Sequence, residues 1–430
     1  MLGQFFHFDE LKTDLRTEIL AGITTFLTMA YIIFVNPDIL SKAGMDRNAV
    51  FVATCLAAAI STLVMGLYAR YPIALAPGMG LNAYFAFVVV GQLGYSWQTA
   101  LGAVFLSGVV FLVISVLPIR RWIIDSIPRS QKMAISAGIG FFLGLIALKS
   151  AGVVVANPAT FVTVGPLTTG PVVLATLGFL AMIALDSRKV PGAIIIGILL
   201  VTIAGMILGL SPWPSGVVDV PPSLAPTFLQ LDISHAWEVG LVVIVFTFLM
   251  VEMFDTAGTL VGVAHRAGLL DAQGRLPRIK QALVCDSGAT VLGTILGTSS
   301  TTCYIESAAG VKAGGRSGLT AVVVGLLFLL ALVFAPIATS IPSYATAPAI
   351  LFVACIMARG MVEVDWDDVT EYAPAVVTAL AMPFTFSIAT GIGLGFVTYA
   401  FVKLLSGRVK DTSLAVWCLT GLFILKFIVD

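Results

Sequence analysis

The stretch Ala76-Pro-Gly-Met-Gly-Leu-Asn-Ala-Tyr-Phe85 interrupts an apolar run with one proline, two glycines and an amide. Proline and glycine disfavour a continuous helix, so the wider segment 73–92 is expected to hold extended backbone followed by a half-helix. The short segment 301–312 opens on Thr298-Ser-Ser-Thr-Thr302 and predicts the same arrangement. Within a membrane, irregular backbone is tolerated only where it is buried in protein or lines a cavity. These two stretches therefore indicate where the fold has its centre.

The composition around them is that of a membrane protein. Hydrophobic residues make up 59% of the 430 residues, charged residues make up 11%, and the mean hydropathy is +1.04. A soluble domain has about 25% charged residues. Apolar stretches long enough to span a bilayer recur along the chain, so we predict an all-α polytopic membrane protein. The predicted membrane segments are 19–37, 49–68, 73–92, 99–117, 131–150, 171–186, 190–210, 240–263, 281–297, 301–312, 317–338, 344–358, 373–388, 390–406 and 413–429.

The basic residues predict the orientation. If the N-terminus is cytoplasmic and the first fourteen segments alternate, only Lys42, Arg47 and Lys149 of the basic residues between segments fall outside. This asymmetry favours a multi-pass protein of the plasma (inner) membrane with a cytoplasmic N-terminus. Segment 413–429 is an extra C-terminal apolar element, either a fifteenth span or a helix at the interface. The acidic stretch 363–371 is expected to be a solvated or interfacial connector.

The two halves of the chain show a weak internal repeat. Thr25-Phe-Leu27 recurs as Thr247-Phe-Leu249 at an offset of 222 residues, and the same offset brings the broken segment around Gly80 near Thr302. Seven segments per half is an odd number, so the second half enters the membrane from the opposite side. We therefore predict two inverted repeats of seven segments, with short extended stretches in segments 3 and 10.

Four carboxylates lie well inside apolar segments, and no Lys, Arg or His lies at comparable depth. They are Glu252, Asp255, Asp286 and Glu306, and the spacing of the first two puts them on one helix face. A carboxylate at membrane depth costs at least about 2.5–3.5 kcal/mol, which favours a functional role over a buried network that only holds helices together. For Asp286 a helix cap is an equal alternative. Carboxylates accept hydrogen bonds from N–H donors, bind cations or carry protons.

Asn82, on the first broken segment, adds a group that both donates and accepts, although it could also cap its own half-helix. A planar heterocycle with donors and acceptors around its rim would suit this set. An aromatic side chain is expected to stack on such a base, and Phe26, Phe85, Phe248 and Phe254 are candidates that the sequence does not rank.

Three further residues are candidates for secondary contacts with the ligand. Thr302 and Tyr304 belong to the second broken segment, and Thr28 belongs to the first membrane segment. For Thr28, helix packing through a small hydroxyl group is the alternative.

Three separated motifs give a specific resemblance that covers nearly the whole chain. The stretch 76–85, Glu252-Met-Phe-Asp-Thr-Ala-Gly-Thr259 and Gly297-Thr-Ser-Ser-Thr-Thr-Cys-Tyr-Ile-Glu-Ser-Ala-Ala-Gly310 resemble the adenine/guanine/hypoxanthine permeases. These form the AzgA-like branch of the nucleobase–cation symporter 2 (nucleobase–ascorbate) family. The resemblance implies a uracil-transporter-like fold of fourteen segments. It implies a core domain in two parts, 1–117 and 240–338, a gate domain in two parts, 118–210 and 339–406, an extracellular connector, 211–239, and an extra C-terminal part, 407–430.

The resemblance also implies a site between the broken segments and the eighth segment. The substrate-binding residues would be Asn82, Gly80, Glu252, Asp255 and Glu306. The ninth-segment Asp of the family matches Asp286. Because no His lies one turn after the eighth-segment acid, Glu252 or Asp286 would carry the coupling proton.

We therefore expect a proton-coupled importer of purine bases such as hypoxanthine, guanine or adenine. It would use no cofactor and no bound metal, and its coupling ion would be H⁺ in preference to Na⁺. Its partners would be a small purine base and the lipid bilayer, and not nucleic acid. The oligomeric state is open, with a homodimer through the gate domain as one option.

Two kinds of alternative remain. The same fold could serve a sulfate or bicarbonate exchanger, against which the buried acids argue, or a uracil- or xanthine-type symporter. A membrane enzyme or receptor would need a constellation such as two His with a carboxylate, which the sequence does not show.

Overall fold

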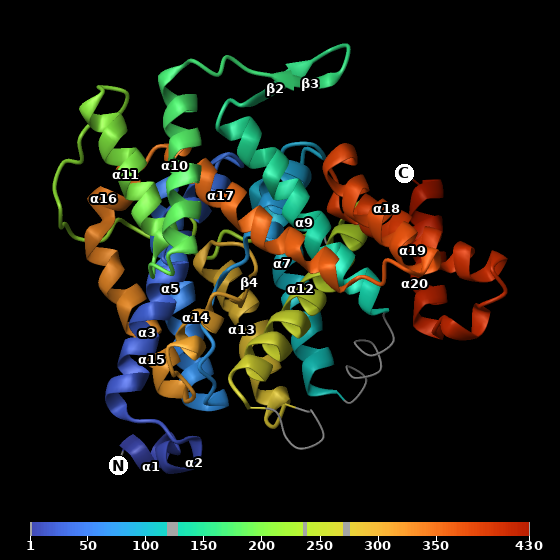
Figure 1. Ribbon diagram of the computed structural model, residues 1–430, viewed down its shortest axis with the longest axis horizontal. Coiled ribbons are helices and arrows are strands. Elements are labelled where there is room, and N and C mark those ends of the chain that lie inside the picture. The colour runs from blue at the N-terminus through green and yellow to red at the C-terminus, as the bar shows by residue number, and fades with distance from the viewer. Residues whose placement is uncertain (1, 118–127, 235–238, 270–275, 430) are drawn as a thin grey trace. The chain divides into compact units, whose positions relative to one another are not determined.

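The computed structural model describes residues 2–117, 128–234, 239–269 and 276–429 (Figure 1). Residues 118–127, at the start of the predicted gate segment, and 235–238, in the predicted connector, lie outside these ranges. The chain divides into two compact units. The first unit comprises Met1–Val116 and Leu174–Ala349, and the second comprises Leu117–Val173 and Ile350–Asp430.

The part of the first unit that the structure describes is almost entirely helical, with two short strands. Its N-terminal part consists of α1 (Leu2–Phe5), α2 (Phe8–Leu11), α3 (Leu15–Met29), α4 (Ile32–Ser41), α5 (Arg47–Val64), a π-helical turn (Met65–Ala69), β1 (Leu75–Pro77), α6 (Met79–Ala83), a second π-helical turn (Tyr84–Val90) and α7 (Trp97–Val116). Its later part consists of α11 (Ala193–Ile207), α12 (Val239–Arg266), α13 (Ile279–Leu296), β4 (Thr301–Cys303), α14 (Ser307–Lys312), α15 (Gly318–Ala331), a 3-10 turn (Leu332–Phe334) and α16 (Ala335–Ser340). Helix α10 (Gly170–Ser187) enters this unit from the second, and α17 (Ser343–Ala358) leaves it.

Local sequence signals explain where several of these helices begin and end. The Asp14 side chain accepts hydrogen bonds from the backbone N–H groups at the start of α3, and Asp46 does the same for α5. Both are N-caps, which satisfy donors that the first helical turn leaves free. Helix α13 ends at Gly297, whose φ of 93° lies in the left-handed region that glycine adopts without a steric penalty.

The two broken segments meet at the strands β1 and β4. These strands pair antiparallel with the register Leu75↔Cys303, Ala76↔Thr302 and Pro77↔Thr301, and each leads into a half-helix, α6 or α14. The Thr62 hydroxyl of α5 donates to the Leu75 carbonyl and accepts from the Leu75 N–H, both at 2.9 Å. The extended stretches predicted in segments 3 and 10 are thus confirmed, and each supplies hydrogen-bond partners for the other's backbone.

Eight helical stretches in the described part of the chain are long and apolar enough to cross a membrane, and shorter apolar helices add to them. The first, Leu15–Ser41, extends beyond the predicted segment 19–37 and is interrupted between α3 and α4 at Ala30 and Tyr31. The C-terminal apolar helix α20 (Leu414–Val429) falls on the predicted segment 413–429. The number of fourteen spans stays a prediction.

Within its described residues, the second unit combines four long helices with a β-hairpin. It contains α9 (Arg129–Ser150), β2 (Val154–Asn157), β3 (Phe161–Val164), a 3-10 turn (Arg359–Glu363), α18 (Val369–Thr385), α19 (Ile388–Leu405), a further 3-10 turn (Val409–Asp411) and α20. Helix α18 packs against both α9 and α19, and strands β2 and β3 pair antiparallel.

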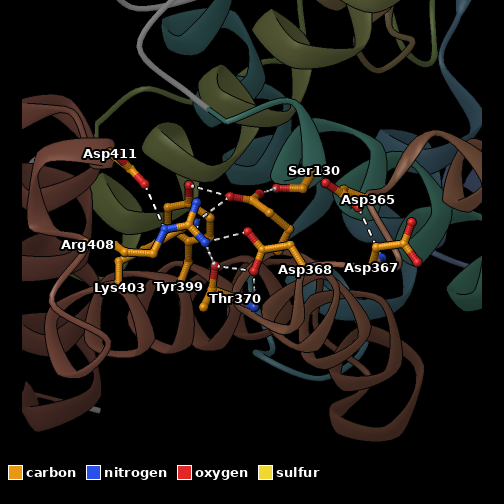
Figure 2. A network of polar contacts seen from close by, with 10 residues as sticks. Ser130, Asp365, Asp367, Asp368, Thr370, Tyr399, Lys403, Arg408 and Asp411 are labelled. Carbon is orange, nitrogen blue, oxygen red and sulfur yellow. Dashed lines mark hydrogen bonds and ion pairs between the residues drawn. The ribbon is translucent and has the colours of Figure 1, made fainter.

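A polar network joins the ends of α9, α18 and α19 within this unit (Figure 2). The Lys403 amine is fully buried, lies 2.6 Å from a Glu371 carboxylate oxygen and donates to the Thr370 hydroxyl at 2.7 Å. The stretch 363–371 was expected to be a solvated or interfacial connector. Asp365 and Asp367 are exposed, whereas Glu371 is only partly exposed and pairs with a buried cation.

Candidate functional site

The four predicted acids come from three elements of the first unit. Glu252 and Asp255 lie on α12, Asp286 lies on α13, and Glu306 directly precedes α14. Glu252 and Asp286 have no exposed surface, whereas Asp255 and Glu306 are partly exposed. Asp286 hydrogen-bonds β4 directly, Glu252 reaches the same strand through Thr290, and Glu306 lies three residues after the strand ends. The structure therefore brings the four carboxylates into one cluster beside the paired strands.

Asp286 is held by three hydrogen-bond donors. The Thr256 hydroxyl donates to one carboxylate oxygen at 2.5 Å, and the other oxygen accepts from the Cys303 N–H at 2.8 Å and the Thr302 hydroxyl at 3.3 Å. Since Cys303 and Thr302 belong to β4, this carboxylate ties the strand to α12 and α13. The helix cap considered as an alternative for Asp286 is wrong, because this residue lies in the middle of α13, and its structural role is to hold β4.

Glu252 is bound by the Thr290 hydroxyl, and the Ser300 hydroxyl also lies near its carboxylate. Its Oε1 accepts from the hydroxyl of Thr290 on α13, which in turn lies 3.2 Å from the Ser300 hydroxyl. Its Oε2 is buried and has no hydrogen-bond partner within the described residues. A buried acceptor without a partner costs free energy, of the order of 1–3 kcal/mol or more for a charged group, and a bound N–H group or a proton would remove that cost.

Glu306 accepts a hydrogen bond of 2.5 Å from the hydroxyl of Tyr31, which occupies the break between α3 and α4. The Thr28 hydroxyl is 2.8 Å from the Thr25 carbonyl and 3.5 Å from the Glu306 carbonyl. The local contact of Thr28 is thus the stronger one, in line with the packing alternative.

Asn82 is fully buried on α6 and its amide nitrogen donates to Asn36 at 2.5 Å. Its carbonyl oxygen has no hydrogen-bond partner among the residues that the structure describes. Gly80, two residues earlier on the same half-helix, is partly exposed. Asn82 therefore does not cap α6, whose N-cap is Gly78, and its free acceptor adds to that of Glu252.

Tyr304 and Phe26, two candidates for contacts with the ligand, also make contacts within the protein. The Tyr304 hydroxyl donates to the Pro77 carbonyl at 2.5 Å, so it ties the second broken segment to the first. The Phe26 ring packs edge-on against Phe328, with centroids 5.2 Å apart. Phe85 and Phe248 are fully buried, and the side chain of Phe254 lies outside the description. The aromatic partner of a base is therefore not assigned.

Sequence reasoning missed the residues that position the acids. Asn36 sits in the apolar run Ile32–Leu40, where a buried amide was a visible signal, and Tyr31, Thr256 and Thr290 are hydroxyl groups within predicted spans. Such hydroxyls are frequent in membrane helices, so they carry little signal without a partner.

Two further acids, which lie just outside the predicted segment 19–37, are also buried. Glu18 has no exposed surface and accepts from the Thr320 hydroxyl and from the backbone N–H of Arg316. Asp38 is 6% exposed and accepts from Ser343 at 2.7 Å. Both sit near segment ends and fasten neighbouring elements to each other. No group of acids, cysteines and histidines in the described residues has the arrangement of a metal site.

A family model described as "Permease family" matches residues 16–394. The chain belongs to this permease family. It is a transporter and not an enzyme, and it is a multi-pass membrane protein. Together with this family model, the relatives described next, which are named adenine and guanine/hypoxanthine permeases, confirm the resemblance of the three motifs to the purine branch of the nucleobase–cation symporter 2 family.

The relatives are similar over almost their whole length. A putative permease of Methanocaldococcus jannaschii is 53% identical over 99% of this chain and 98% of its own. The adenine permease AdeP of Escherichia coli is 48% identical over 100% and 96%. The guanine/hypoxanthine permease PbuG of Bacillus subtilis is 46% identical over 99% of each chain.

Solved structures agree in fold. The transmembrane domain of the cyanobacterial bicarbonate transporter BicA superposes with a TM-score of 0.66 at 15% identity, covering 89% of this permease and 97% of that chain. Murine Slc26a9 in the inward-facing state gives a TM-score of 0.67 at 10% identity. The uracil-transporter-like fold expected from the sequence is therefore confirmed, while identities this low say nothing about substrate.

Proposed function

We propose that this permease imports purine nucleobases by proton symport. The observation that carries the proposal is the pair of buried, unpartnered acceptors on Asn82 and Glu252, beside the paired broken segments. A purine carries N–H groups on its rim, which such acceptors would bind. The names of relatives that are 46–48% identical, an adenine permease and a guanine/hypoxanthine permease, support the same class of substrate.

The predicted binding residues would act together around the base. Glu252 and Glu306 would accept N–H groups, Gly80 would allow close approach of the base to the half-helix, and Asp255 would orient the site from α12. Thr302 would act indirectly, since it already hydrogen-bonds Asp286. Acids, amides and hydroxyls make up this cluster, which favours a neutral base with N–H donors over an inorganic anion.

Of the two acids considered for proton coupling, Glu252 is the better candidate. Asp286 already receives three hydrogen bonds, whereas Glu252 keeps one oxygen without a partner. Protonation of Glu252 would remove a charge whose burial is costly, and so would favour a closed, desolvated site. The coupling ion would be H⁺ and not Na⁺.

The remaining features of the proposal concern the whole molecule. The N-terminus would be cytoplasmic in the plasma (inner) membrane, because the basic residues gather on that side. Segments 1–4 and 8–11 would form a core that carries the base past a gate of segments 5–7 and 12–14. A homodimer through the gate is an option that cross-linking in membranes would test.

Uptake into cells that lack their own purine carriers tests the proposal. We expect labelled hypoxanthine, guanine or adenine to accumulate, and a protonophore to abolish the accumulation. Glu252→Gln should abolish uphill accumulation while leaving exchange of internal for external base measurable. Glu10→Gln, at an exposed position near the N-terminus, is the matched control and should accumulate base as the wild type does. Undiminished uphill uptake by Glu252→Gln would refute the assignment of the proton, and absence of uptake of all three bases would refute the function.

A further inference from the structure

A chain of hydrogen bonds leads from the backbone of α5 to the amide of Asn82. We propose that Asn36 is a positioning residue that fixes Asn82 with its carbonyl oxygen toward the substrate, so that the bound base must present an N–H group there. This proposal rests on the function proposed above. It adds which side donates in one contact: the base donates and Asn82 accepts. Asn36, Thr54, Thr298 and Asn82 all have no exposed surface, so water does not compete for these groups.

The direction of the chain is set at its first link. The Thr54 hydroxyl donates its only proton to the Val50 carbonyl at 2.6 Å. Its oxygen can then only accept from the side chain that faces it. Asn36 lies 2.7 Å from that oxygen, and the group it presents must be its NH₂. The same nitrogen donates to the Thr298 hydroxyl at 2.9 Å, so both of its protons are used.

The second link follows from the first. With its nitrogen committed, Asn36 can offer only its carbonyl oxygen to Asn82. The two side chains lie 2.5 Å apart, and Asn82 must therefore donate with its NH₂ group. Oxygen and nitrogen of an amide are distinguished by their partners, and here one hydroxyl in α5 decides both amides.

The last link is open. The Asn82 carbonyl oxygen is buried without a hydrogen-bond partner in the described part of the chain, like Oε2 of Glu252. Turning Asn82 alone, with its NH₂ toward the ligand, would set two carbonyl oxygens against each other at Asn36, and turning both amides would require Thr54 to give up its bond to the Val50 carbonyl. The site is thus biased to accept, and a ligand that presents an acceptor at this point would leave two oxygens facing each other.

Sites built to hydrogen-bond one substrate group discriminate strongly against an analogue that lacks it, because their own buried group is then left unpaired. Asn36 does not need to touch the base to govern this discrimination. Its removal should weaken the preference for one particular N–H group while leaving the other contacts of the base unchanged.

The test uses purified full-length permease in liposomes and competition against labelled hypoxanthine. The competitors are compared in pairs that differ by one rim N–H group: guanine with hypoxanthine, adenine with purine, and hypoxanthine with its 1-, 7- and 9-methyl derivatives. In the wild type we expect at least one pair to differ tenfold or more in affinity. In Asn36→Leu the ratio for that pair should fall at least fivefold, and the ratios for the other pairs should stay within twofold.

Two substitutions of Thr54 complete the experiment: one is a second test and the other is its control. Thr54→Val keeps the shape of the side chain but removes the oxygen that orients Asn36, so it should shift the same ratio, and it carries the test if Asn36→Leu does not fold. Thr54→Ser keeps the hydroxyl and should behave as the wild type. Unchanged ratios in a binding-competent Asn36→Leu or Thr54→Val, or an equal loss for every pair, would overturn the role of Asn36. A wild-type protein that binds no purine would instead refute the proposed function itself.

Discussion

The buried ion pair of the second unit leads to an asymmetric prediction about stability. The Lys403 amine is fully buried between the Glu371 carboxylate, at 2.6 Å, and the Thr370 hydroxyl, at 2.7 Å (Figure 2). Glu371 has more partners than Lys403. Its carboxylate also accepts hydrogen bonds from Tyr399 at 3.1 Å and from Ser130 at 2.5 Å, and 21% of its side chain is exposed to solvent. Loss of the acid should therefore cost more than loss of the amine.

The expected magnitudes follow from this geometry. Removing one partner of a buried pair costs about 3–5 kcal/mol when it leaves an uncompensated charge. Glu371→Gln leaves the buried ammonium without its counter-charge but keeps one acceptor, so we expect a loss of about 3 kcal/mol, the lower end of that range. Lys403→Met should cost about 1 kcal/mol or less, because an apolar side chain suits the buried site and the acid keeps two donors.

The double variant Glu371→Gln/Lys403→Met provides the decisive comparison. It has no uncompensated buried charge at this site, so its stability should return close to that of Lys403→Met alone. Thermal unfolding in detergent, followed by intrinsic fluorescence at a fixed scan rate, measures all four proteins. We expect Glu371→Gln to melt roughly 6–12 °C below the wild type, using about 2–4 °C per kcal/mol. Equal losses for the two single variants, or additive losses in the double variant, would refute the reasoning.

Three further predictions concern packing, acid stability and the site. Gly310→Ala should cost about 1–3 kcal/mol and lower uptake, because the added methyl group would collide with the backbone of α3, against which α14 packs. Hydrogen bonds from Thr370 and Arg408 lower the pKa of Asp368, an N-cap outside the membrane segments. The carboxylate therefore stabilises the fold above about pH 4 and less as the pH falls further, so the difference in melting temperature between wild type and Asp368→Asn should shrink from pH 5 to pH 3. Tyr31→Phe removes the donor of a 2.5 Å bond to a site acid and should raise the KM for the base by about five- to tenfold, which concentration-dependent uptake measures.

The first of these predictions has a control variant, and each of the other two has an outcome that would contradict it. Gly421→Ala on α20, where an added methyl group meets nothing within 4 Å, should leave stability unchanged or raise it by up to about 1 kcal/mol. A melting-temperature difference for Asp368→Asn that grows toward acid pH would contradict the N-cap argument. A Tyr31→Phe variant with unchanged KM but lower protein level would show that the hydroxyl supports folding and not the site.

The features that the sequence predicts well are those with a local cause. Proline and glycine disfavour the interior of a helix. The extended stretch that became β1, and the half-helix after it, were therefore predicted from Pro77 and Gly78. Glu252 and Asp286 lie in long apolar runs, where the cost of burying a charge makes them conspicuous, and both are fully buried.

The features that it predicts poorly depend on distant partners. Glu18, Asp38 and Lys403 lie near the ends of apolar runs, where the linear pattern does not distinguish solvent from a neighbouring helix. All three are buried because a residue elsewhere in the chain pairs with each of them. Thr320 donates a hydrogen bond to Glu18, Ser343 donates one to Asp38, and Glu371 forms an ion pair with Lys403. The charge of a residue near a segment end thus says little about its exposure until its partner is known.

The same distinction applies to roles within the site. From the sequence, Glu252 and Asp286 are equal candidates for carrying a proton, since both are acids in apolar helices. The structure separates them by the number of donors each receives, and those donors come from Thr256, Thr290 and the strand β4, whose positions no single helix specifies. An acid whose oxygens are all engaged is suited to hold a strand in place, and one with a free buried oxygen is suited to exchange a proton or bind a ligand. The count of engaged oxygens, and not the depth of the acid in the membrane, is therefore the property on which a mechanism for this permease should be built.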